Sequence, residues 1–481
     1  MTGRTTPGAF QADPADRARL FDLLSSLIQG HIDGVGDLPA TPDVTPGELR
    51  RHLSGYDFAA PLEPDAVLTE TAAMLRRWTV HTTHPGYFGL FNPNPALMGV
   101  LGESLTAAFN PQLAAWSHAP AAVEIERHVL RFLGERLGWS GEESTGHFTS
   151  GGAEANLTGT LLALTRAFPR LAEDGVRGLS GRPVFYASAE SHLAWLKIAH
   201  MCGLGRDAVR LVPVLPDLRM DHRAAAELIR RDRRDGHLPF LLVGTSGTTS
   251  AGTLDPLPEL AALAAAEDLW FHVDAAWAGA VALSDRLRPV LDGIERADSV
   301  TLDAHKWLAM PMGAGTLLTR HLGALRDTFR VATAYMPPDT PDAEDPYTTT
   351  AQWSRRAIGL KLFMTLATAG RTGYAEMIEH QTALGEELRE RLAAAGWTIT
   401  NATPLPLVCF TDVPDAHPDK AAEHVRGVAD RVTASGRSWI SATRLAGRPS
   451  LRACVTNFAT TESDLRTLLA VLGPPDPAFQ G

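Results

Sequence analysis

Strand-length apolar runs alternate with helical segments through the middle of the chain, and this alternation is the strongest constraint on the fold. The runs at 183–187, 239–244, 270–273 and 299–302 have the length and apolar character of buried strands. Ala- and Leu-rich segments with helical spacing, such as 222–231 and 257–267, lie between them. Such alternation is typical of a mostly parallel sheet with crossover helices. The sequence therefore predicts an α/β fold.

Smaller units are predicted on either side of this region. Apolar residues recur at helical spacing over 17–29, and Pro-rich segments at 38–46 and 61–64 separate further short helices. After Gly370 the pattern restarts, with a helix over 374–395 and a strand at 397–399. We therefore predict an N-terminal helical dimerisation segment (1–95), a large domain (96–372) and a small C-terminal α/β domain (373–481).

Composition excludes several classes of protein. The net charge of −11 argues against nucleic acid or an anionic membrane surface as the main partner. No apolar stretch is long enough to cross a bilayer, and residues 1–20 contain no apolar core of a secretory signal. The three cysteines lie far apart, without metal-type spacing. These features predict a cytoplasmic protein without a metal site.

Polar candidates follow the predicted strands, at the edge where open α/β sheets bind ligands. Ser150-Gly151-Gly152 precedes the helical run 157–168, and the free N–H groups of such a turn can bind phosphate. His192 follows the run 183–187 and Thr245 follows 239–244. Taken singly, these features are equally those of a glycine turn, a loop histidine and a polar turn.

A lysine and an aspartate complete this set. Lys306 is one of four lysines and follows the run 299–302, whereas Asp274 ends the run 270–273. A lysine that can form a Schiff base and an acid that can hold a pyridine nitrogen protonated are what a pyridoxal 5'-phosphate (PLP) site requires. Ala276 is small enough to let a ring lie against the backbone. Alone, Lys306 could be a surface lysine and Asp274 a helix N-cap, but the combined order of motifs predicts a PLP site.

With these residues the chain resembles the group II PLP-dependent decarboxylases, which include aromatic L-amino acid, glutamate and diaminobutyrate decarboxylases. The resemblance covers roughly residues 20–472 and implies the PLP-dependent transferase fold type I. The motifs that carry it are His84-Pro85, Ser150-Gly151-Gly152, His192, Thr245, His272-Val273-Asp274-Ala275-Ala276 and His305-Lys306-Trp307.

The resemblance implies roles for these residues. Lys306 would form the Schiff base, Asp274 would bind the pyridine nitrogen, and His192 would stack on the ring as a base. Thr245 would lie near the ring oxygen or the substrate carboxylate. The phosphate would be bound on the side formed by Ser150, Gly151, Gly152, Asp303 and His305, although many family members carry asparagine in place of Asp303.

Other positions bear on the substrate and on proton transfer. Tyr335 matches the tyrosine of a mobile loop that family members close over a neighbouring active site, where it would protonate the carbanion after carbon dioxide leaves. The predicted substrate-binding residues are Leu90, Phe91, Asn92, Gln112 and His118. Leu90 replaces an aromatic residue of the aromatic amino acid decarboxylases and Asn92 replaces a proline, which predicts a roomier or more polar pocket.

The predicted function is PLP-dependent decarboxylation of an L-amino acid to its primary amine and carbon dioxide, in a homodimer with active sites at the interface. The alternatives are an aldehyde synthase or another PLP lyase on the same scaffold, and a non-catalytic protein with this fold. The presence of Tyr335 and His192 favours simple decarboxylation, and the presence of Lys306 argues against a non-catalytic protein.

Overall fold

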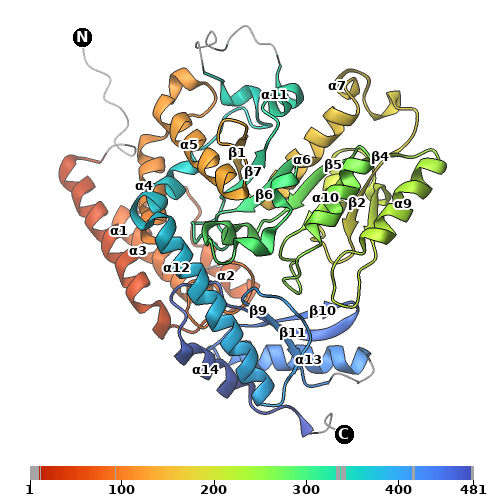
Figure 1. The fold of residues 1–481 in the computed structure, drawn as a ribbon. Coiled ribbons are helices and arrows are strands. Elements are labelled where there is room, and N and C mark those ends of the chain that lie inside the picture. The colour runs from red at the N-terminus through yellow and green to blue at the C-terminus, as the bar shows by residue number, and fades with distance from the viewer. Residues whose placement is uncertain are drawn as a thin grey trace, which may run out of the picture.

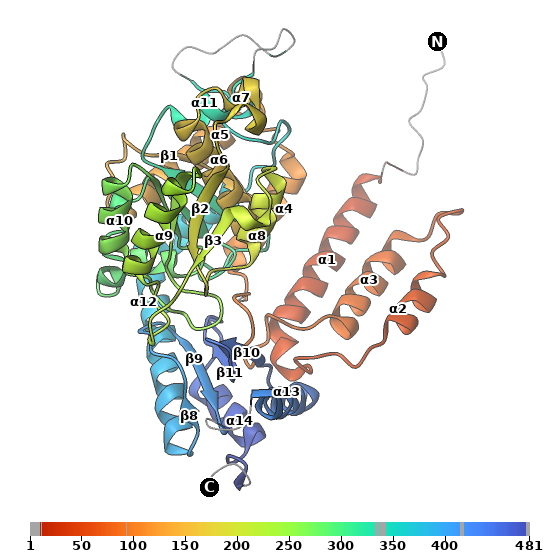
Figure 2. The same ribbon diagram turned by 90° about the vertical axis from the view of Figure 1, so that its right-hand side faces the viewer.

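The computed structural model describes residues 10, 12–92, 94–331, 336, 343–413 and 418–477. Figure 1 shows a large sheet with helices around it, a small sheet beside its lower end, and N-terminal helices along one side. The N-terminal helices are α1 (Pro14–Gly34), α2 (Pro46–Leu53) and α3 (Pro64–Trp78). None of the three contains a buried residue, and they project away from the rest of the chain (Figure 2).

The large sheet has seven strands in the order β1-β7-β6-β5-β4-β2-β3. Strands β6, β5, β4, β2 and β3 pair in parallel, whereas β7 is antiparallel to both of its neighbours. The strands are β1 (Thr145–Thr149), β2 (Pro183–Ser188), β3 (Val209–Val212), β4 (Leu238–Thr245), β5 (Trp270–Asp274), β6 (Ser299–Asp303) and β7 (Gly315–Thr319). The sheet is therefore mostly parallel, as fold type I requires.

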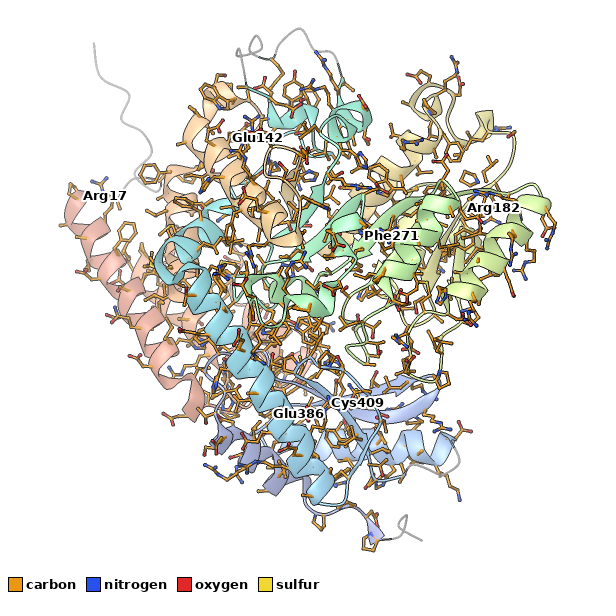
Figure 3. The ribbon with its side chains drawn as sticks, viewed as in Figure 1. Arg17, Glu142, Arg182, Phe271, Glu386 and Cys409 are labelled. Carbon is orange, nitrogen blue, oxygen red and sulfur yellow. The ribbon has the colours of Figure 1, made fainter. Side chains whose placement is uncertain are left out.

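Helices cover both faces of this sheet. Helix α6 contacts strands β4 to β7, and α9 and α10 contact β4 from the crossover connections. The helices of this part are α4 (Leu97–Phe109), α5 (Pro120–Leu137), α6 (Gly152–Ala167), α7 (Leu171–Asp174), α8 (Ala194–Met201), α9 (His222–Arg234), α10 (Leu257–Ala266) and α11 (Ala324–Phe329). Phe271 of β5 lies in the apolar core between these layers (Figure 3).

The C-terminal unit has its own sheet and core. Its four antiparallel strands run in the order β10-β11-β9-β8, and Cys409 lies on the central strand β9 (Figure 3). The strands are β8 (Thr398–Ile399), β9 (Leu407–Thr411), β10 (Ser441–Leu445) and β11 (Arg448–Cys454), and the helices are α13 (Pro418–Ala434) and α14 (Glu462–Leu472). Apolar side chains of both helices and the sheet form a second core.

One helix joins the two units and differs from the prediction. A new helix was expected after Gly370, but α12 already begins before it and runs Gly359–Ala394. Gly370 has φ +64° and kinks the helix, which explains why the sequence pattern is interrupted there. The domain boundaries predicted from the sequence stay proposals.

The remaining predicted elements agree well with the structure. The four predicted central strands correspond to β2, β4, β5 and β6, and the predicted helices over 17–29, 157–168, 222–231 and 257–267 correspond to α1, α6, α9 and α10. Strands β1, β3 and β7 were not predicted. No helix within the described residues is long and apolar enough to cross a membrane.

Candidate active site

The register of the parallel strands places the polar candidates at one edge of the large sheet. Thr245 at the end of β4 pairs with Asp274 at the end of β5, and Asp274 pairs with Thr301 of β6. Lys306 follows β6 after a short turn. These strand ends surround a cavity, and its lining includes eight residues predicted from the sequence: Phe91, Gly152, His192, Thr245, Asp274, Ala276, Asp303 and Lys306.

Lys306 presents an amine to this cavity. Its Nζ lies 3.1 Å from Asp303 Oδ2 and 5.6 Å from the centre of the Phe91 ring. The side chain is 24% exposed, so the amine remains accessible from the cavity. An accessible lysine amine, once deprotonated, can attack a carbonyl carbon.

Asp274 is buried and acts only as an acceptor toward its neighbours. Asn156 Nδ2 donates to its Oδ2 at 2.9 Å, and the Ala276 backbone N–H donates to its Oδ1 at 3.1 Å. A carboxylate has lone pairs for more hydrogen bonds than these two. It can therefore accept a further proton-bearing group from the cavity, such as a protonated ring nitrogen.

The start of α6 approaches the turn after β6 closely. A Cβ atom on Gly152 would lie 2.8 Å from Asp303 Oδ2, and one on Gly151 would lie 3.4 Å from the His305 ring. No side chain caps α6, so its first N–H groups are available to an anion. Ser150 is exposed and does not line the cavity.

His305 is oriented by a backbone N–H group. The Ala314 N–H donates to His305 Nδ1 at 3.1 Å, which places the proton of the neutral ring on Nε2. Burial lowers the pKa of His305, and the nearby Asp303 carboxylate opposes this effect. His305 Nε2 lies 3.8 Å from Asp303 Oδ2, so its N–H group is directed toward the glycine turn and the turn after β6.

Asp303 fits the lysine better than it fits a phosphate. Its Oδ2 contacts Lys306, and its Oδ1 is buried without a hydrogen-bond partner in the described part of the chain. An ionised carboxylate offers no donor to a phosphate. The predicted phosphate role of Asp303 therefore stays a prediction.

His192 and Thr245 lie on the opposite wall of the cavity. The Ala194 N–H donates to His192 Nδ1 at 3.1 Å, and Thr245 Oγ1 lies 3.0 Å from Ser191 Oγ. Desolvation lowers the pKa of His192, while the Asp274 carboxylate opposes the shift. His192 thus presents a largely neutral imidazole at the mouth of the cavity.

Of the predicted substrate-binding residues, only Phe91 lines the cavity. Leu90 is 50% exposed, and Asn92 Nδ2 donates to Met312 Sδ at 3.1 Å. Gln112 and His118 are exposed and do not reach the cavity within one chain. Tyr335 lies outside the described residues.

Comparison with known proteins identifies the family. Residues 46–412 match the pyridoxal-dependent decarboxylase conserved domain, which is more than half of the chain. The chain belongs to the pyridoxal-dependent decarboxylase family. It is therefore a PLP-dependent carboxy-lyase of fold type I.

Similar proteins in the family span most of this decarboxylase. An aromatic-L-amino-acid decarboxylase of Bacillus atrophaeus is 28% identical over 92% of both chains. An L-2,4-diaminobutyrate decarboxylase of Rhizobium meliloti is 32% identical over 81% of this chain and 77% of its own. The crystal structure of Oryza sativa TDC with PLP and tryptamine superposes with a TM-score of 0.90 at 25% identity, over 96% of this chain and 98% of that one.

The residues of the cavity fit the cofactor of this family. A lysine amine and an acceptor-only carboxylate line the same cavity, and glycines at an uncapped helix start leave room for an anion beside them. PLP carries an aldehyde, a ring nitrogen and a phosphate, which are complementary to these three features. The decarboxylase therefore has the groups needed to hold PLP in one orientation.

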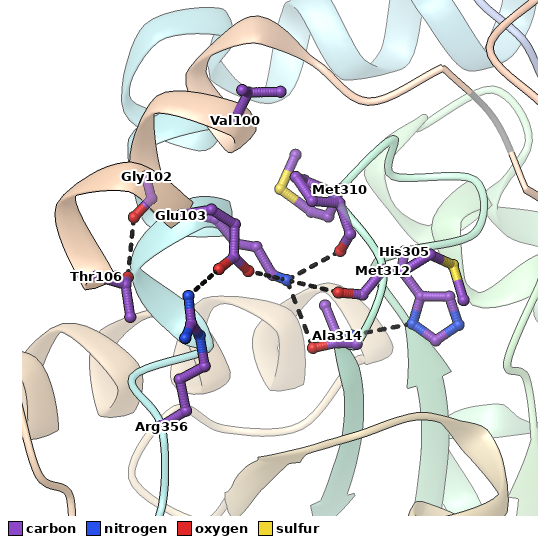
Figure 4. Close-up of polar contacts among 12 residues, drawn as sticks. Val100, Gly102, Glu103, Thr106, His305, Met310, Met312, Ala314 and Arg356 are labelled. Carbon is purple, nitrogen blue, oxygen red and sulfur yellow. Dashed lines mark hydrogen bonds and ion pairs between the residues drawn. The ribbon is translucent and has the colours of Figure 1, made fainter. Parts of the chain in front are cut away.

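A buried lysine outside the cavity binds the turn whose Ala314 N–H donates to His305. Figure 4 shows Glu103 and the turn that carries Met310, Met312 and Ala314 near His305. The lysine is Lys361 of α12, which is 1% exposed. Its Nζ donates to Glu103 Oε1 at 2.5 Å and to the Pro311 carbonyl at 2.9 Å. Burial lowers the pKa of Lys361, and Glu103 opposes the shift. The turn that orients His305 is thereby fixed to helices α4 and α12.

Sequence reasoning missed three residues at or beside the cavity: Trp277, Arg452 and Asn156. Trp277 stacks between Phe91, at 4.5 Å, and Trp307, at 5.0 Å. Arg452 has its guanidinium 4.7 Å from the Phe91 ring but does not itself line the cavity. Asn156 follows the Ser150-Gly151-Gly152 motif on α6, whereas Arg452 comes from β11 with no local signal.

Proposed function

We propose that this enzyme removes the carboxylate of an L-amino acid and releases the primary amine and carbon dioxide. The observation that carries the proposal is the placement of Lys306 and Asp274 on one cavity in a chain of this family. The similar proteins named above include decarboxylases of aromatic amino acids and of diaminobutyrate, which supports an amino acid substrate.

The roles of the chain's residues follow from their contacts. When PLP is bound, its ring supplies an electron sink for the bond that breaks. We propose that Lys306 binds the cofactor aldehyde, that Asp274 keeps a proton on the ring nitrogen, and that His192 covers the ring. His305 and the N–H groups of Gly151 and Gly152 would bind the phosphate. Phe91 would shape the substrate side of the cavity.

The proposal is tested by the products. Purified enzyme with PLP is incubated with each standard amino acid and with ornithine, diaminobutyrate and cysteine sulfinate. We expect carbon dioxide and primary amine in equal amounts from at least one of them. Release of aldehyde and hydrogen peroxide instead of amine would establish the aldehyde synthase alternative. No carbon dioxide from any substrate, with PLP bound, would overturn the proposed function.

We further propose a homodimer with the active sites at its interface. Apolar side chains on α1, α3 and α4 are exposed in the single chain: Phe21, Leu24, Ile32, Val67, Leu75, Leu97, Leu101, Leu105 and Phe109. Helices that bury no residue of their own are seldom stable in isolation. A second copy is the partner that would cover this surface in a purified protein.

Sedimentation is expected to give twice the chain mass of 51.6 kDa. Phe21→Asp should weaken this association and lower activity in parallel, because a charge replaces an apolar contact. Ser26→Asp, on another face of α1, provides the matched control and should leave the dimer intact. A fully active monomer of the unmodified protein would contradict the proposal.

The sequence-based role of Tyr335 leads to a separate prediction. Tyr335→Phe should slow amine formation or shift the product toward aldehyde while PLP and substrate still bind, since phenylalanine lacks the phenolic proton. Amine and aldehyde are quantified under single-turnover conditions. Clean amine at the wild-type rate would show that Tyr335 only packs in the closed enzyme.

We also propose a cytoplasmic location. The three cysteines of the chain all lie in the described part and are free, as is usual in a reducing compartment.

A further inference from the structure

We propose that Asn156 and His272 are positioning residues that hold Asp274 as a proton-accepting carboxylate for the cofactor ring nitrogen. The inference deepens the proposed function and rests on it in one respect, the binding of PLP in this cavity. Asn156 lines the cavity and His272 does not, and both act on the ring nitrogen only through Asp274. They act through a buried chain of hydrogen bonds whose direction is fixed at its Asp274 end.

The hydrogen-bond chain has at one end the indole of Trp270, which can only donate. Trp270 Nε1 lies 2.8 Å from Ser299 Oγ, so the serine oxygen accepts this hydrogen bond. The Ser299 hydroxyl proton is then free to be donated to His272 Nδ1, 2.7 Å away. Because a hydroxyl oxygen can accept two hydrogen bonds, the tryptophan alone leaves the direction of the Ser299–His272 contact open, and the Asp274 end of the chain decides it.

The links between His272 and the cavity set the donor and acceptor roles along the hydrogen-bond chain. His272 Nε2 donates to Asn156 Oδ1 at 3.0 Å, and Asn156 Nδ2 donates to Asp274 Oδ2 at 2.9 Å. The reverse orientation of the Asn156 amide would set its oxygen against a carboxylate oxygen and its N–H₂ against an N–H group. The proton of the neutral His272 ring therefore lies on Nε2, which also lies 3.3 Å from Thr301 Oγ1, and Nδ1 accepts from the Ser299 hydroxyl.

All five members of this hydrogen-bond chain are shielded from solvent. Trp270, Ser299, His272, Asn156 and Asp274 are all buried, with exposures of 6%, 0%, 0%, 2% and 6%. Burial lowers the pKa of His272 to about 4, so the ring is neutral near pH 7. A neutral His272 donates from Nε2 and accepts at Nδ1, as the chain requires.

A glycine in the middle of α6 makes room for the imidazole. A Cβ atom on Gly159 would lie 2.7 Å from His272 Nδ1. On the other side, the Trp195 ring meets the imidazole edge to face at 5.7 Å. The site thus accommodates one orientation of His272, and glycine is retained at a helical position where it is intrinsically unfavourable.

The consequence concerns the proton on the cofactor ring. Asp274 accepts hydrogen bonds at both oxygens, one from Asn156 Nδ2 and one from the Ala276 N–H. These contacts hold the carboxylate in position to accept a hydrogen bond from a protonated ring nitrogen. Without Asn156, the Nε2–H of His272 loses its main acceptor and Asp274 loses a donor.

The test uses the dimeric enzyme with PLP and without substrate, so that its outcome does not depend on which reaction follows. Asn156→Leu, which keeps the branching at Cγ but removes both polar groups, should raise the PLP dissociation constant about 10- to 100-fold, by analogy with the loss of a supporting contact at a metal ligand. The ¹⁵N signal of pyridine-labelled PLP should move toward the unprotonated position. His272→Phe should act in the same direction.

Thr160→Val is the matched control, because Thr160 is also buried on α6 but donates only to the Asn156 backbone carbonyl. It should leave both readouts at wild-type values. Wild-type PLP affinity and ¹⁵N signal in Asn156→Leu, or equal effects of Thr160→Val, would overturn the proposal. The unmodified enzyme gives an independent test: ¹⁵N-histidine NMR should show His272 neutral with its proton on Nε2, and a proton on Nδ1 would also overturn it.

Discussion

Replacing Lys306 with alanine is expected to abolish both the visible absorbance of the bound cofactor and carbon dioxide release. Lys306 lines the cavity with Asp274, and no other lysine lines it. Lys361 is buried and engaged with Glu103 and backbone carbonyls. Alanine leaves no amine that could bind the aldehyde.

Borohydride reduction followed by peptide mapping measures this directly. In the unmodified enzyme the reduced cofactor should be found on Lys306, and in Lys306→Ala on no residue. Lys420→Ala, which removes an exposed lysine on α13, should behave like the unmodified enzyme. A reducible adduct on Lys197 or Lys361 in the Lys306 variant would refute the site assignment.

The second large effect is expected from Asp274→Asn, which should still bind PLP, with lower affinity, and lower the rate of decarboxylation about 10²- to 10³-fold, as removal of one preorganised charge-stabilising group does. An amide carries no charge to hold the ring nitrogen protonated. Both Asp274 oxygens accept from N–H groups, so the new NH₂ group must also face a donor.

Single-turnover carbon dioxide release and the PLP content of the purified variant separate chemistry from binding. Asp232→Asn is a suitable control, since Asp232 is a buried carboxylate that accepts from Tyr186 and Arg210 away from the cavity. If Asp274→Asn decarboxylates at the wild-type rate, the electron-sink role of Asp274 is wrong.

The central strands could be predicted because both of their faces are buried. Strands β2, β4, β5 and β6 lie inside a parallel sheet and therefore appear as continuous apolar runs. Strand β1 at the sheet edge reads Thr-Gly-His-Phe-Thr, and β7 contains three polar or glycine positions among five. Their place in the sheet comes from antiparallel pairing, which no local apolar pattern encodes.

Some residues of the site could likewise be predicted from the sequence, and others could not. Asp274 and Lys306 could be predicted because each follows its own strand, and parallel strands bring their carboxyl ends together. Arg452 could not, because it belongs to the small sheet and reaches Phe91 only through packing of the two units. Asn156 was visible in the sequence, but its contact with Asp274 depends on how α6 lies across the sheet.

The N-terminal helices have a further consequence for how the enzyme is made. Because α1, α2 and α3 bury no residue within their own chain, their order would depend on the concentration of folded copies. A newly synthesised chain would expose this apolar surface until it meets a second chain. Completion of the native enzyme would then be a bimolecular step, slow when the protein is dilute and in competition with aggregation.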